Sequence, residues 1–400
     1  MKILVINCGS SSIKYKVFTL ASEDVLAKGI VERIGMMGSQ LTHVLLTGRN
    51  VEKKTIIEKD INDHQAALGL IVGTLLDQEY GVLTSLGDIK AVGHRVVHGG
   101  EKFSEAVMVD DHVIKSLRAC SDMAPLHNPP NLLGISATQE YFPWARQIAV
   151  FDTAFHQKMP QKAYLYGLPY RIYQEYGVRR YGFHGTSHQY VAERAAVLLG
   201  QALGDLKIIT CHLGNGASIA AVKNGIAVDT SMGFTPLEGL VMGTRSGNVD
   251  PAIIPYLMEK EGLSVEEVNT LLNKESGVLG LSGLSSDFRD LIIAEKQGNT
   301  RAAMALDVFA YNVVKYIGAY FMIMGGTDAL VFTAGVGENS PEMRNQICSY
   351  LKFIGVEIDQ VKNSVNGKET IISNSRSSYK VLIIPANEEL MIAREVKKLL

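Results

Sequence analysis

The chain has 400 residues, of which 46% are hydrophobic and 20% charged, and its formal net charge is −2 at pH 7. This composition is typical of a globular protein, and the length predicts two domains. The sequence contains no block of Lys and Arg, which argues against nucleic acid or a membrane surface as the main partner.

Two further features bear on the compartment in which the protein works. The four cysteines are scattered without a CxxC pair, which predicts buried free thiols in a reducing compartment. Met1 leads directly into a strand pattern, so no signal peptide is expected, and the most apolar stretch, 317–324, is too short to span a bilayer. We therefore expect a cytoplasmic protein.

The first distinctive pattern is a strand, a Gly-Ser turn and a returning strand. Residues 3–6 are a continuous apolar run, Gly9 and three serines interrupt it, and 13–18 resume a strand pattern. The turn offers backbone N–H groups and hydroxyls, with Lys14 just beyond, and these are donors for phosphate oxygens. An ordinary polar hairpin has the same pattern, and neither a Walker A loop nor a GxGxxG loop is present.

A second copy of this pattern lies at residues 207–222. Aligning Lys207 with Lys2 superposes the apolar runs and places Gly214 on Gly9. The repeat predicts two similar halves, each with a glycine-rich hairpin, that hold a phosphate chain between them.

The next segments predict a helix and a strand with an unusual charge. Residues 61–78 have helical spacing, with Asn62 or Asp63 as N-cap. Residues 89–98 read as a strand with Arg95 inside it. Because an unpaired buried arginine is very costly, Arg95 either forms a salt bridge or contacts an anion.

Residues 124–131 form a proline-rich loop that carries His127, and a helix is expected to begin near Asn131. The apolar strand that follows, 148–152, ends on Asp152. An acid at the end of such a strand is a common active-site placement in α/β folds and also a common helix cap.

His184 and His188 precede or begin a helix that runs to Leu199, with Thr186 or Ser187 as the expected N-cap. Their spacing of four resembles a metal pair, but the missing third ligand argues against zinc. A polar site is expected for His184, and a capping or core role for His188.

The second half of the chain continues with a long glycine-rich loop, 230–250, that contains Arg245 and precedes a helix beginning at Pro251. A turn and a helix capped near Ser285 or Ser286 are expected next, followed by a helix over 301–324 and a strand over 328–333.

A Gly-x-Gly turn at residues 335–337 follows that strand, and Ser340 and Pro341 are a strong helix start. Strand, turn and helix together suggest a nucleotide pocket. The last predicted elements are a strand from residue 381 and a helix after Asn387, in which Glu388 either complements the helix dipole or helps to place a hydrated cation.

Nine long motifs in this order resemble the acetate kinase (acetokinase) family over essentially the whole chain. They are VINCGSSSIKY, GHRVVHGG, APLHNPPN, FDTAFH, YGFHGTSH, HLGNGAS, GFTPLEGLVMGTRSG, FTAGVGENSPEMR and PANEE. The resemblance implies an α/β fold of the actin-like ATPase and sugar kinase superfamily, with two similar actin-like (ribonuclease H-like) domains around a central nucleotide cleft. The expected domains are residues 1–152 plus 387–400, closed by the C-terminal helix, and residues 153–386, which carry most of the nucleotide site.

The resemblance also implies roles for individual residues. The catalytic positions are Arg95, Asp152, His184 and Arg245. The substrate positions are Arg95 and His127, together with an apolar pocket for the acetate methyl group formed by Val97, Leu126, Phe183 and Pro236. The ATP positions are Ser10, Ser12, Lys14, His212, Leu213, Gly214, Asn215, Gly216, Asp287, Phe288, Arg289, Gly335, Val336, Gly337, Glu338 and Asn339. The magnesium positions, where Mn²⁺ is expected to substitute, are Asn7 and Glu388.

The implied reaction is reversible, Mg²⁺-dependent, in-line transfer of the ATP γ-phosphoryl group to acetate, giving acetyl phosphate and ADP. The family is typically homodimeric, and the resemblance implies neither a nucleic acid nor a membrane partner. Because a carboxylate with a pKa of about 4.3 is already ionised at neutral pH, no base is needed. Catalysis should then come from positioning, charge neutralisation and closure of the two domains, and we expect Asp152 to orient an arginine or a magnesium-bound water.

Two alternatives remain open at this point. One is a propionate kinase or broader short-chain acyl kinase, because one methylene changes discrimination by only about 1–3 kcal/mol. The other is a non-enzymatic actin-like nucleotide switch, which would leave Arg95, Asp152, His184 and Arg245 without a role. The chain departs from the family pattern at Cys8, usually alanine, at Asn248, often aspartate, and at Ala334, often glycine, where adenosine fit should change slightly.

Overall fold

A computed structural model describes residues 1–47, 50–125 and 127–400, which divide into two compact units. Unit 1 comprises Met1–Gln157 and Asn387–Leu400, and unit 2 comprises Lys158–Ala386. The domain limits expected from the sequence stay a prediction, because a compact unit is not by itself an independently folding domain. Within the described ranges, no helix combines the length and the apolar character that crossing a membrane requires.

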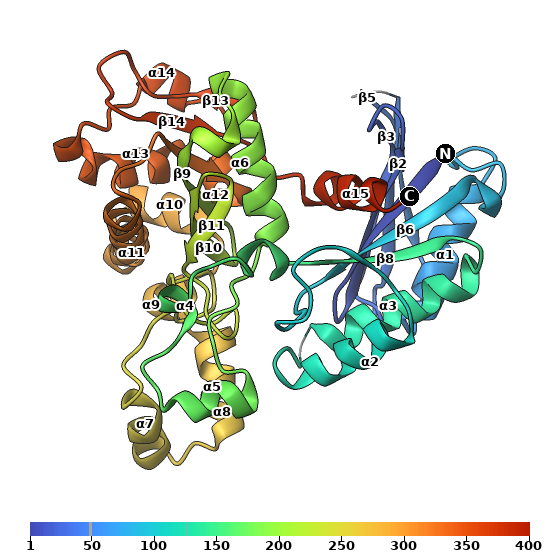
Figure 1. Cartoon of the computed structure of the whole chain (residues 1–400), viewed down its shortest axis with the longest axis horizontal. Coiled ribbons are helices and arrows are strands. Elements are labelled where there is room, and N and C mark those ends of the chain that lie inside the picture. Colours follow the sequence, from blue (N-terminus) through green and yellow to red (C-terminus); the bar gives the residue numbers. More distant parts are fainter. Residues whose placement is uncertain (48–49, 126) are drawn as a thin grey trace. The chain divides into compact units, whose positions relative to one another are not determined.

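Unit 1 is built on an eight-stranded sheet in the order β5-β4-β3-β2-β1-β6-β8-β7 (Figure 1). Its strands are β1 Lys2–Cys8, β2 Ser12–Thr19, β3 Val25–Glu32, β4 Gln40–Thr47, β5 Asn50–Glu58, β6 Ile89–Val96, β7 Val107–Met108 and β8 Arg146–Phe151. Its helices are α1 His64–Leu76, α2 Asp111–Ala119, α3 Asn128–Tyr141 and α15 Glu388–Lys398, with short 3₁₀ turns at Leu86–Asp88, Cys120–Asp122 and Ala154–His156.

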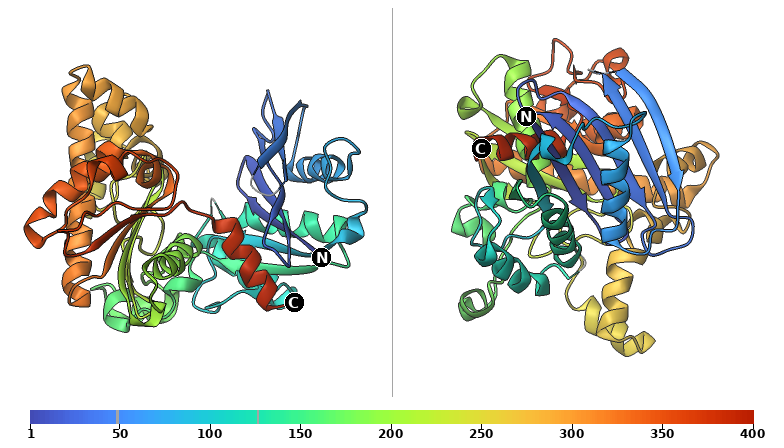
Figure 2. Two further views of the ribbon diagram at one scale, coloured as in Figure 1. Left: turned by 90° about the horizontal axis from the view of Figure 1, so that it is seen from above. Right: turned by 90° about the vertical axis from the view of Figure 1, so that its right-hand side faces the viewer.

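Strand β1 lies at the centre of this sheet and is buried on both faces, as its continuous apolar run predicts. Leu4 and Ile6 belong to the core that includes residues of α1 and α3. Ile3 and Val5 belong to the core on the opposite face, which α15 covers (Figure 2). The C-terminal helix therefore completes the fold of the N-terminal unit.

Unit 2 is built on a six-stranded sheet in the order β11-β10-β9-β12-β14-β13. Its strands are β9 Lys207–Leu213, β10 Ala217–Lys223, β11 Ile226–Thr230, β12 Ala329–Thr333, β13 Thr370–Ile371 and β14 Lys380–Ile383. Its longest helices, α6 Gly185–Leu199 and α11 Thr300–Met324, lie on opposite sides of the sheet (Figure 1).

The remaining helical segments of unit 2 are shorter. They are α4 Gln161–Tyr164, α5 Tyr170–Tyr176, α7 Ile253–Glu261, α8 Val265–Thr270, α9 Gly277–Ser282, α10 Phe288–Lys296, α12 Ala334–Asn339, α13 Pro341–Tyr350 and α14 Gln360–Asn363, with 3₁₀ turns at Leu203–Asp205 and Lys352–Ile354 and a π-helical turn at Leu271–Glu275.

The two sheets share one arrangement. In unit 1, β1 pairs antiparallel with β2 and parallel with β6, which in turn is parallel to β8. In unit 2, β9 pairs antiparallel with β10 and parallel with β12, which is parallel to β14. The predicted repeat of one α/β arrangement in the two halves is thereby confirmed, and so is the equivalence of residues 2–8 and 207–213.

Several helix starts differ from those expected. Helix α3 begins at Asn128 rather than near Asn131, because the prolines occupy its first turn, where no N–H partner is needed. Helix α10 is capped by Asp287, whose side chain accepts the Arg289 N–H, and not by Ser285 or Ser286. Helix α7 begins at Ile253, two residues after Pro251.

Two further helix starts differ from the expected ones, and both involve strained backbone. Helix α6 is capped by His184 with φ +55°, and not by Thr186 or Ser187. The expected Gly-x-Gly turn is absent because α12 begins directly at Ala334, which has φ +63°. Left-handed conformations are costly for residues with a Cβ and tend to persist at functional sites.

Candidate active site

In unit 1, charged side chains gather where the parallel strands end. Ile6 pairs with His94 in the register of β1 and β6, and Asn7 pairs with Lys14 across β1 and β2. Because Ile6 faces α1 and α3, alternation turns Asn7, Lys14 and Arg95 to the face that α15 covers. The carboxyl ends of parallel strands are the usual place for a ligand in such sheets.

Arg95 forms a two-pronged salt bridge with Asp152, the first residue after β8. Its Nε donates to Oδ1 at 3.0 Å and its Nη2 donates to Oδ2 at 2.6 Å, while Asp152 is only 1% exposed. Burial lowers the pKa of Arg95, but Asp152 and Glu388 raise it, so the net shift is upward and the guanidinium stays charged. Arg95 therefore forms the salt bridge that was one of its two expected roles. Contact with an anion, the other role, is still possible, because Asp152 uses only two of its five N–H donors.

Glu388 is the first residue of α15, and its Oε2 lies 3.7 Å from Arg95 Nε. Burial raises the pKa of Glu388, Arg95 opposes this, and the charge of Asp152 adds to it, with a net upward shift. The start of α15 is fixed by Lys16, whose Nζ lies 2.9 Å from Glu389 Oε2 and 3.3 Å from Asn387 Oδ1. The sequence did not single out Lys16, which lies two residues after Lys14 on the same face of β2.

The residues assigned to magnesium fit a sparsely ligated Mg²⁺. No cluster of three His, Cys, Asp or Glu side chains suited to a metal occurs in the described ranges. Glu388 nevertheless supplies a partly buried carboxylate with a raised pKa, which a cation would stabilise. Asn7 supplies an amide oxygen on the same face of unit 1, and Mg²⁺ usually keeps several waters beside one or two such protein oxygens.

The hairpin turn after β1 is held by two side chains from neighbouring helices. His64 Nε2 bonds to the Gly9 carbonyl at 2.7 Å, and Asn131 Nδ2 donates to the Cys8 carbonyl at 2.8 Å. Asn131 Oδ1 also accepts the Val97 N–H at 3.1 Å, which ties the ends of β1 and β6 together. Ser10 remains exposed, as a phosphate contact requires.

The predicted acetate pocket is described only in part. Val97 and Phe183 are 7% and 1% exposed, and His127 and Pro236 are partly exposed. Leu126 lies outside the described residues. Val97 and His127 belong to unit 1 and Phe183 and Pro236 to unit 2, so the pocket itself stays a prediction.

In unit 2, His184, His212 and Arg245 lie around the turn between β9 and β10. The rings of His184 and His212 stack with centroids 4.1 Å apart. A Cβ added at Gly216 would lie 3.4 Å from Arg245 Nη1 and 3.5 Å from His184 Nε2, which is van der Waals contact, so both side chains reach this turn. His184 and Arg245 are 32 and 29 positions from Gly216 in the sequence, and only the fold brings them to this turn.

Arg245 differs from Arg95 in having no acidic partner among the described residues. Its Nη1 contacts the Pro236 carbonyl at 3.4 Å, and burial lowers the pKa of its guanidinium. A half-buried cation without a counter-ion is costly unless a ligand supplies the negative charge.

A cavity of about 670 Å³ in unit 2 is lined by most of the residues of that unit that the sequence assigns to ATP. This volume is in the range typical of small-molecule sites. Eight of the residues assigned to ATP line it, namely Gly214, Asn215, Asp287, Phe288, Arg289, Gly335, Val336 and Asn339.

The other residues assigned to ATP in unit 2 do not line this cavity. His212 and Gly216 lie in the histidine and arginine cluster, and Leu213 is completely buried. Glu338 points elsewhere, since its Oε1 accepts the Ala386 N–H at 2.8 Å and burial raises its pKa. Glu338 is therefore better explained as a support for the chain that leads to Glu388.

Sequence reasoning missed five residues of the cavity wall: Ser286, Ile292, Ile293, Ser340 and Glu342. Ile292 follows Phe288 by four residues in α10 and therefore shares its face of the helix, which was an available signal.

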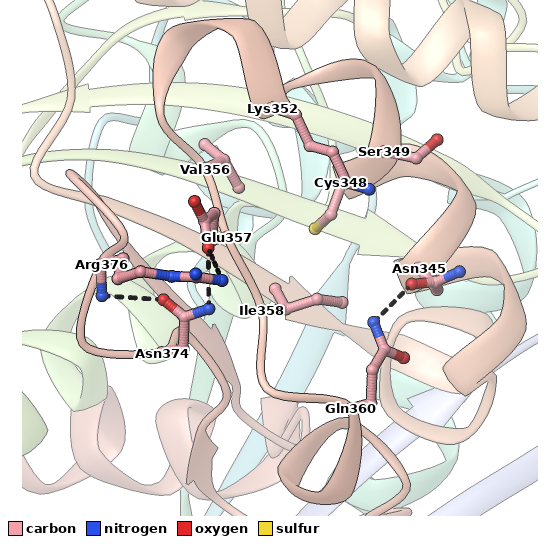
Figure 3. A pocket seen from close by; sticks show the side chains of 10 residues that line it. All are labelled: Asn345, Cys348, Ser349, Lys352, Val356, Glu357, Ile358, Gln360, Asn374 and Arg376. Carbon is pink, nitrogen blue, oxygen red and sulfur yellow. Dashed lines mark hydrogen bonds and ion pairs between the residues drawn. The ribbon is translucent and has the colours of Figure 1, made fainter.

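A second cavity, of about 320 Å³, lies beside α13 (Figure 3). Its polar side chains bond mainly to one another: Arg376 Nη2 to Glu357 Oε2 at 2.8 Å, and Gln360 Nε2 to Asn345 Oδ1 at 2.8 Å. Burial raises the pKa of Cys348 on its wall to about 12, so this thiol is not a nucleophile. None of the predicted site residues lines this cavity.

Comparisons with known proteins identify close relatives. The model of the acetokinase family matches residues 2–394. An acetate kinase from Natranaerobius thermophilus is 60% identical over 400 residues, covering all of both chains. The crystal structure of Porphyromonas gingivalis acetate kinase is 49% identical with a TM-score of 0.93, covering 99% of each chain. A propionate kinase structure from Francisella tularensis is 41% identical with a TM-score of 0.91, covering 98% of each chain.

Proposed function

The chain belongs to the acetokinase family, and from this premise we propose that it transfers the γ-phosphoryl group of ATP to acetate, giving acetyl phosphate and ADP. One observation carries the proposal furthest. Gly214 and Asn215, in the turn between β9 and β10, line the cavity of unit 2. The next residue of the turn, Gly216, lies beside Arg245 and His184. Arg245 and His184, which can donate hydrogen bonds to a phosphoryl group, thus lie next to a cavity large enough for a nucleoside.

The acceptor explains why arginines are needed. Acetate is an anion at neutral pH, since carboxyl groups of this kind have a pKa of about 4.3, so the main obstacle is its repulsion from the ATP phosphates. Arg245 supplies an uncompensated positive charge, and Arg95 supplies N–H donors in a fixed fork. In this proposal Arg95 holds the acid, and Arg245 neutralises the phosphoryl group during direct in-line transfer.

Asp152 is proposed to position Arg95 rather than to move a proton. Both of its oxygens already accept N–H groups of Arg95, and it is almost completely buried. The carboxylate acceptor has no proton to lose, so the transfer step does not require a general base.

Glu388 and Asn7 are the residues proposed to hold magnesium. When bound, Mg²⁺ would neutralise charge on the ATP phosphates. The protein's own contribution is to keep the Glu388 carboxylate at the start of α15, where Lys16 and the Asn387 cap fix it.

Propionate is the second candidate acceptor, because the similar Francisella tularensis structure is a propionate kinase. One extra methylene in an apolar pocket changes the transition-state binding free energy by only about 1–3 kcal/mol. The described residues do not decide between the two acids.

Trapping of acyl phosphate with hydroxylamine tests the proposed function. Purified protein receives Mg·ATP with acetate, propionate, butyrate or no acid. We expect kcat/KM for acetate to be at least about tenfold above propionate. Equal or better use of propionate would change the substrate but keep the mechanism, and no product from any acid, with ATP still bound, would favour a nucleotide switch.

A homodimer is also proposed, on the strength of the family resemblance. Light scattering after size-exclusion chromatography should then give twice the chain mass of 43.6 kDa. A monomer at working concentrations would contradict this part of the proposal.

A further inference from the structure

A chain of hydrogen bonds runs from Thr210 in β9 to His184 at the start of α6. Thr210 Oγ1 bonds to His188 Nδ1 at 2.7 Å, and His188 Nε2 bonds to Ser218 Oγ at 2.8 Å. Ser218 Oγ bonds in turn to His184 Nδ1 at 2.9 Å. Thr210, His188 and Ser218 are completely buried, so water does not compete for these bonds.

The number of protons available limits how this chain is arranged. Each hydroxyl has one hydrogen to donate, and each neutral imidazole has one N–H and one acceptor nitrogen. If Ser218 accepted from both histidines, its buried O–H would have no acceptor among the described residues, so it donates to one histidine and accepts from the other. Two arrangements of these three bonds then remain, and they leave a neutral His184 as opposite tautomers.

In the first arrangement, Thr210 donates to His188, His188 donates to Ser218, and Ser218 donates to His184 Nδ1. The proton of His184 is then on Nε2. In the second, every bond runs the other way, and Thr210 donates to the Ala220 carbonyl, its further acceptor among the described residues.

Distances favour the first arrangement. Thr210 Oγ1 lies 3.4 Å from the Ala220 carbonyl but 2.7 Å from His188 Nδ1. Hydroxyl hydrogen bonds are normally 2.5–3.0 Å long, so only the contact with His188 has the length of a good bond.

His212 has its tautomer fixed in the same way. Ser187 Oγ is completely buried and bonds to His212 Nδ1 at 2.7 Å. This nitrogen is the one partner of the hydroxyl among the described residues. A buried O–H without an acceptor is costly, so Ser187 donates, and the proton of His212 is on Nε2.

We propose that Thr210, His188 and Ser218 hold His184 as the neutral Nε2–H tautomer, that Ser187 does the same for His212, and that both rings donate Nε2–H to oxygens of the phosphoryl group. This inference rests on the proposed function and makes His188 a positioning residue. Neutral rings also suit the stacking of His184 on His212, because two imidazolium rings with centroids 4.1 Å apart would repel each other. The positive charge at the turn is then supplied by Arg245 alone among these three side chains.

Nuclear magnetic resonance tests the tautomers without any activity measurement. The chain is labelled with ¹⁵N-histidine, and long-range ¹H–¹⁵N spectra at pH 7.5 distinguish Nε2–H, Nδ1–H and imidazolium forms. His184→Gln and His212→Gln assign the signals by their disappearance. We expect Nε2–H for both rings in the unchanged protein, and an Nδ1–H or imidazolium form of His184 would overturn the proposal.

A matched pair at position 210 tests the chain of bonds. Thr210→Val keeps the shape of the side chain but removes the hydroxyl, whereas Thr210→Ser keeps the hydroxyl. We expect the valine variant alone to show an Nδ1–H fraction on His184, with kcat about threefold to tenfold lower, the effect of one hydrogen bond. Ser187→Ala should change the tautomer populations of His212 and leave those of His184 unaltered.

An unchanged His184 spectrum in Thr210→Val, or equal spectra for valine and serine, would also overturn the proposal. Failure of the proposed function looks different: the tautomers would be as expected, but no acid would give acyl phosphate. If the valine variant does not fold, the measurement on the unchanged protein still decides.

Discussion

At the scale of single residues, Arg95 and Arg245 are distinguished by their partners. Arg95 is neutralised by Asp152 and lies near Glu388, so it can be buried without a ligand. Arg245 contacts a carbonyl and a methionine sulfur but no carboxylate among the residues that the structure describes. One arginine is thus fixed in geometry, and the other carries a charge that no carboxylate among the described residues offsets.

Removing Arg245 should therefore affect the transfer step more than substrate binding. We expect Arg245→Ala to lower kcat about 10³-fold or more, in line with the contribution of arginines that stabilise phosphoryl transfer. Arg171→Ala is the control, because the Arg171 side chain is 65% exposed and its ion-pair partner among the described residues is Glu175 in the next helical turn. A loss in Arg245→Ala below about tenfold would remove its proposed role.

Asp152→Asn separates positioning from proton transfer. The amide keeps the shape but loses the charge that holds Arg95, so we expect kcat to fall about 10- to 100-fold, the value of a charged hydrogen bond. The pH–rate profile should keep its shape, because no titrating base has been removed. A lost or shifted acidic limb in the profile of the variant would show instead that Asp152 acts as a base.

At the scale of elements, helix α15 connects the far end of the sequence to the first strands. Its apolar face packs Ile392 and Val396 against Ile3 and Val5. Its first turn carries acids that suit the helix dipole. Burial raises the pKa of Glu389, but Lys16 lowers it, and the net shift is downward. The helix therefore fixes Glu388 by packing at one end and by charge at the other.

Lys16→Met should loosen the start of α15 and leave the apolar packing intact. We expect the magnesium concentration for half-maximal activity to rise several-fold, with a loss of stability of only about 1 kcal/mol for a partly exposed ion pair. Lys398→Met is the matched control, since Lys398 lies at the other end of α15 and pairs with Glu395. Equal magnesium dependence in both variants would contradict the anchoring role.

Helix boundaries at this scale were predictable where the cap is local. Asp63, Ser340 and Asn387 cap their helices as expected, because each side chain accepts the backbone N–H three residues ahead. His184 was missed as a cap because its left-handed conformation is maintained by distant contacts, including Ser218 in β10. No local pattern records such a contact.

At the scale of the whole molecule, burial of neutral histidines makes stability depend on pH. His94, beside Arg95 in β6, bonds to Gln147 at 2.8 Å and is 2% exposed. Burial lowers its pKa to about 4, partly offset by the bond to Gln147. The unfolded chain has the ordinary value of about 6.5, so below that pH it binds a proton that the folded chain does not.

The stabilising contribution of His94 should thus be complete above about pH 6.5 and be lost as the pH falls toward 4, by about 3 kcal/mol in total. Urea unfolding at pH 7 and pH 5 measures this for the unchanged chain and for His94→Gln. We expect the unchanged chain to lose about 2 kcal/mol more than the variant between these values. Equal losses would mean that His94 is protonated in the folded state.

Local sequence patterns alone specify the repeated strand arrangement, the family and the residues to examine. Continuous apolar runs specify buried strands, and two copies of one run specify two similar sheets, because side-chain burial is encoded locally. Long motifs then identified the family, and the expected positions of Arg95, Asp152, Arg245 and the nucleotide segments followed from them.

The partner of each charged side chain depends on the fold and could not be read from any local pattern. Arg95 and Asp152 are 57 residues apart and meet because β6 and β8 run parallel in register. The link from Thr210 through His188 and Ser218 to His184 depends on β9, β10 and α6 packing together. Hydrogen bonds act over about 3 Å, and a sequence does not state which distant side chains come that close.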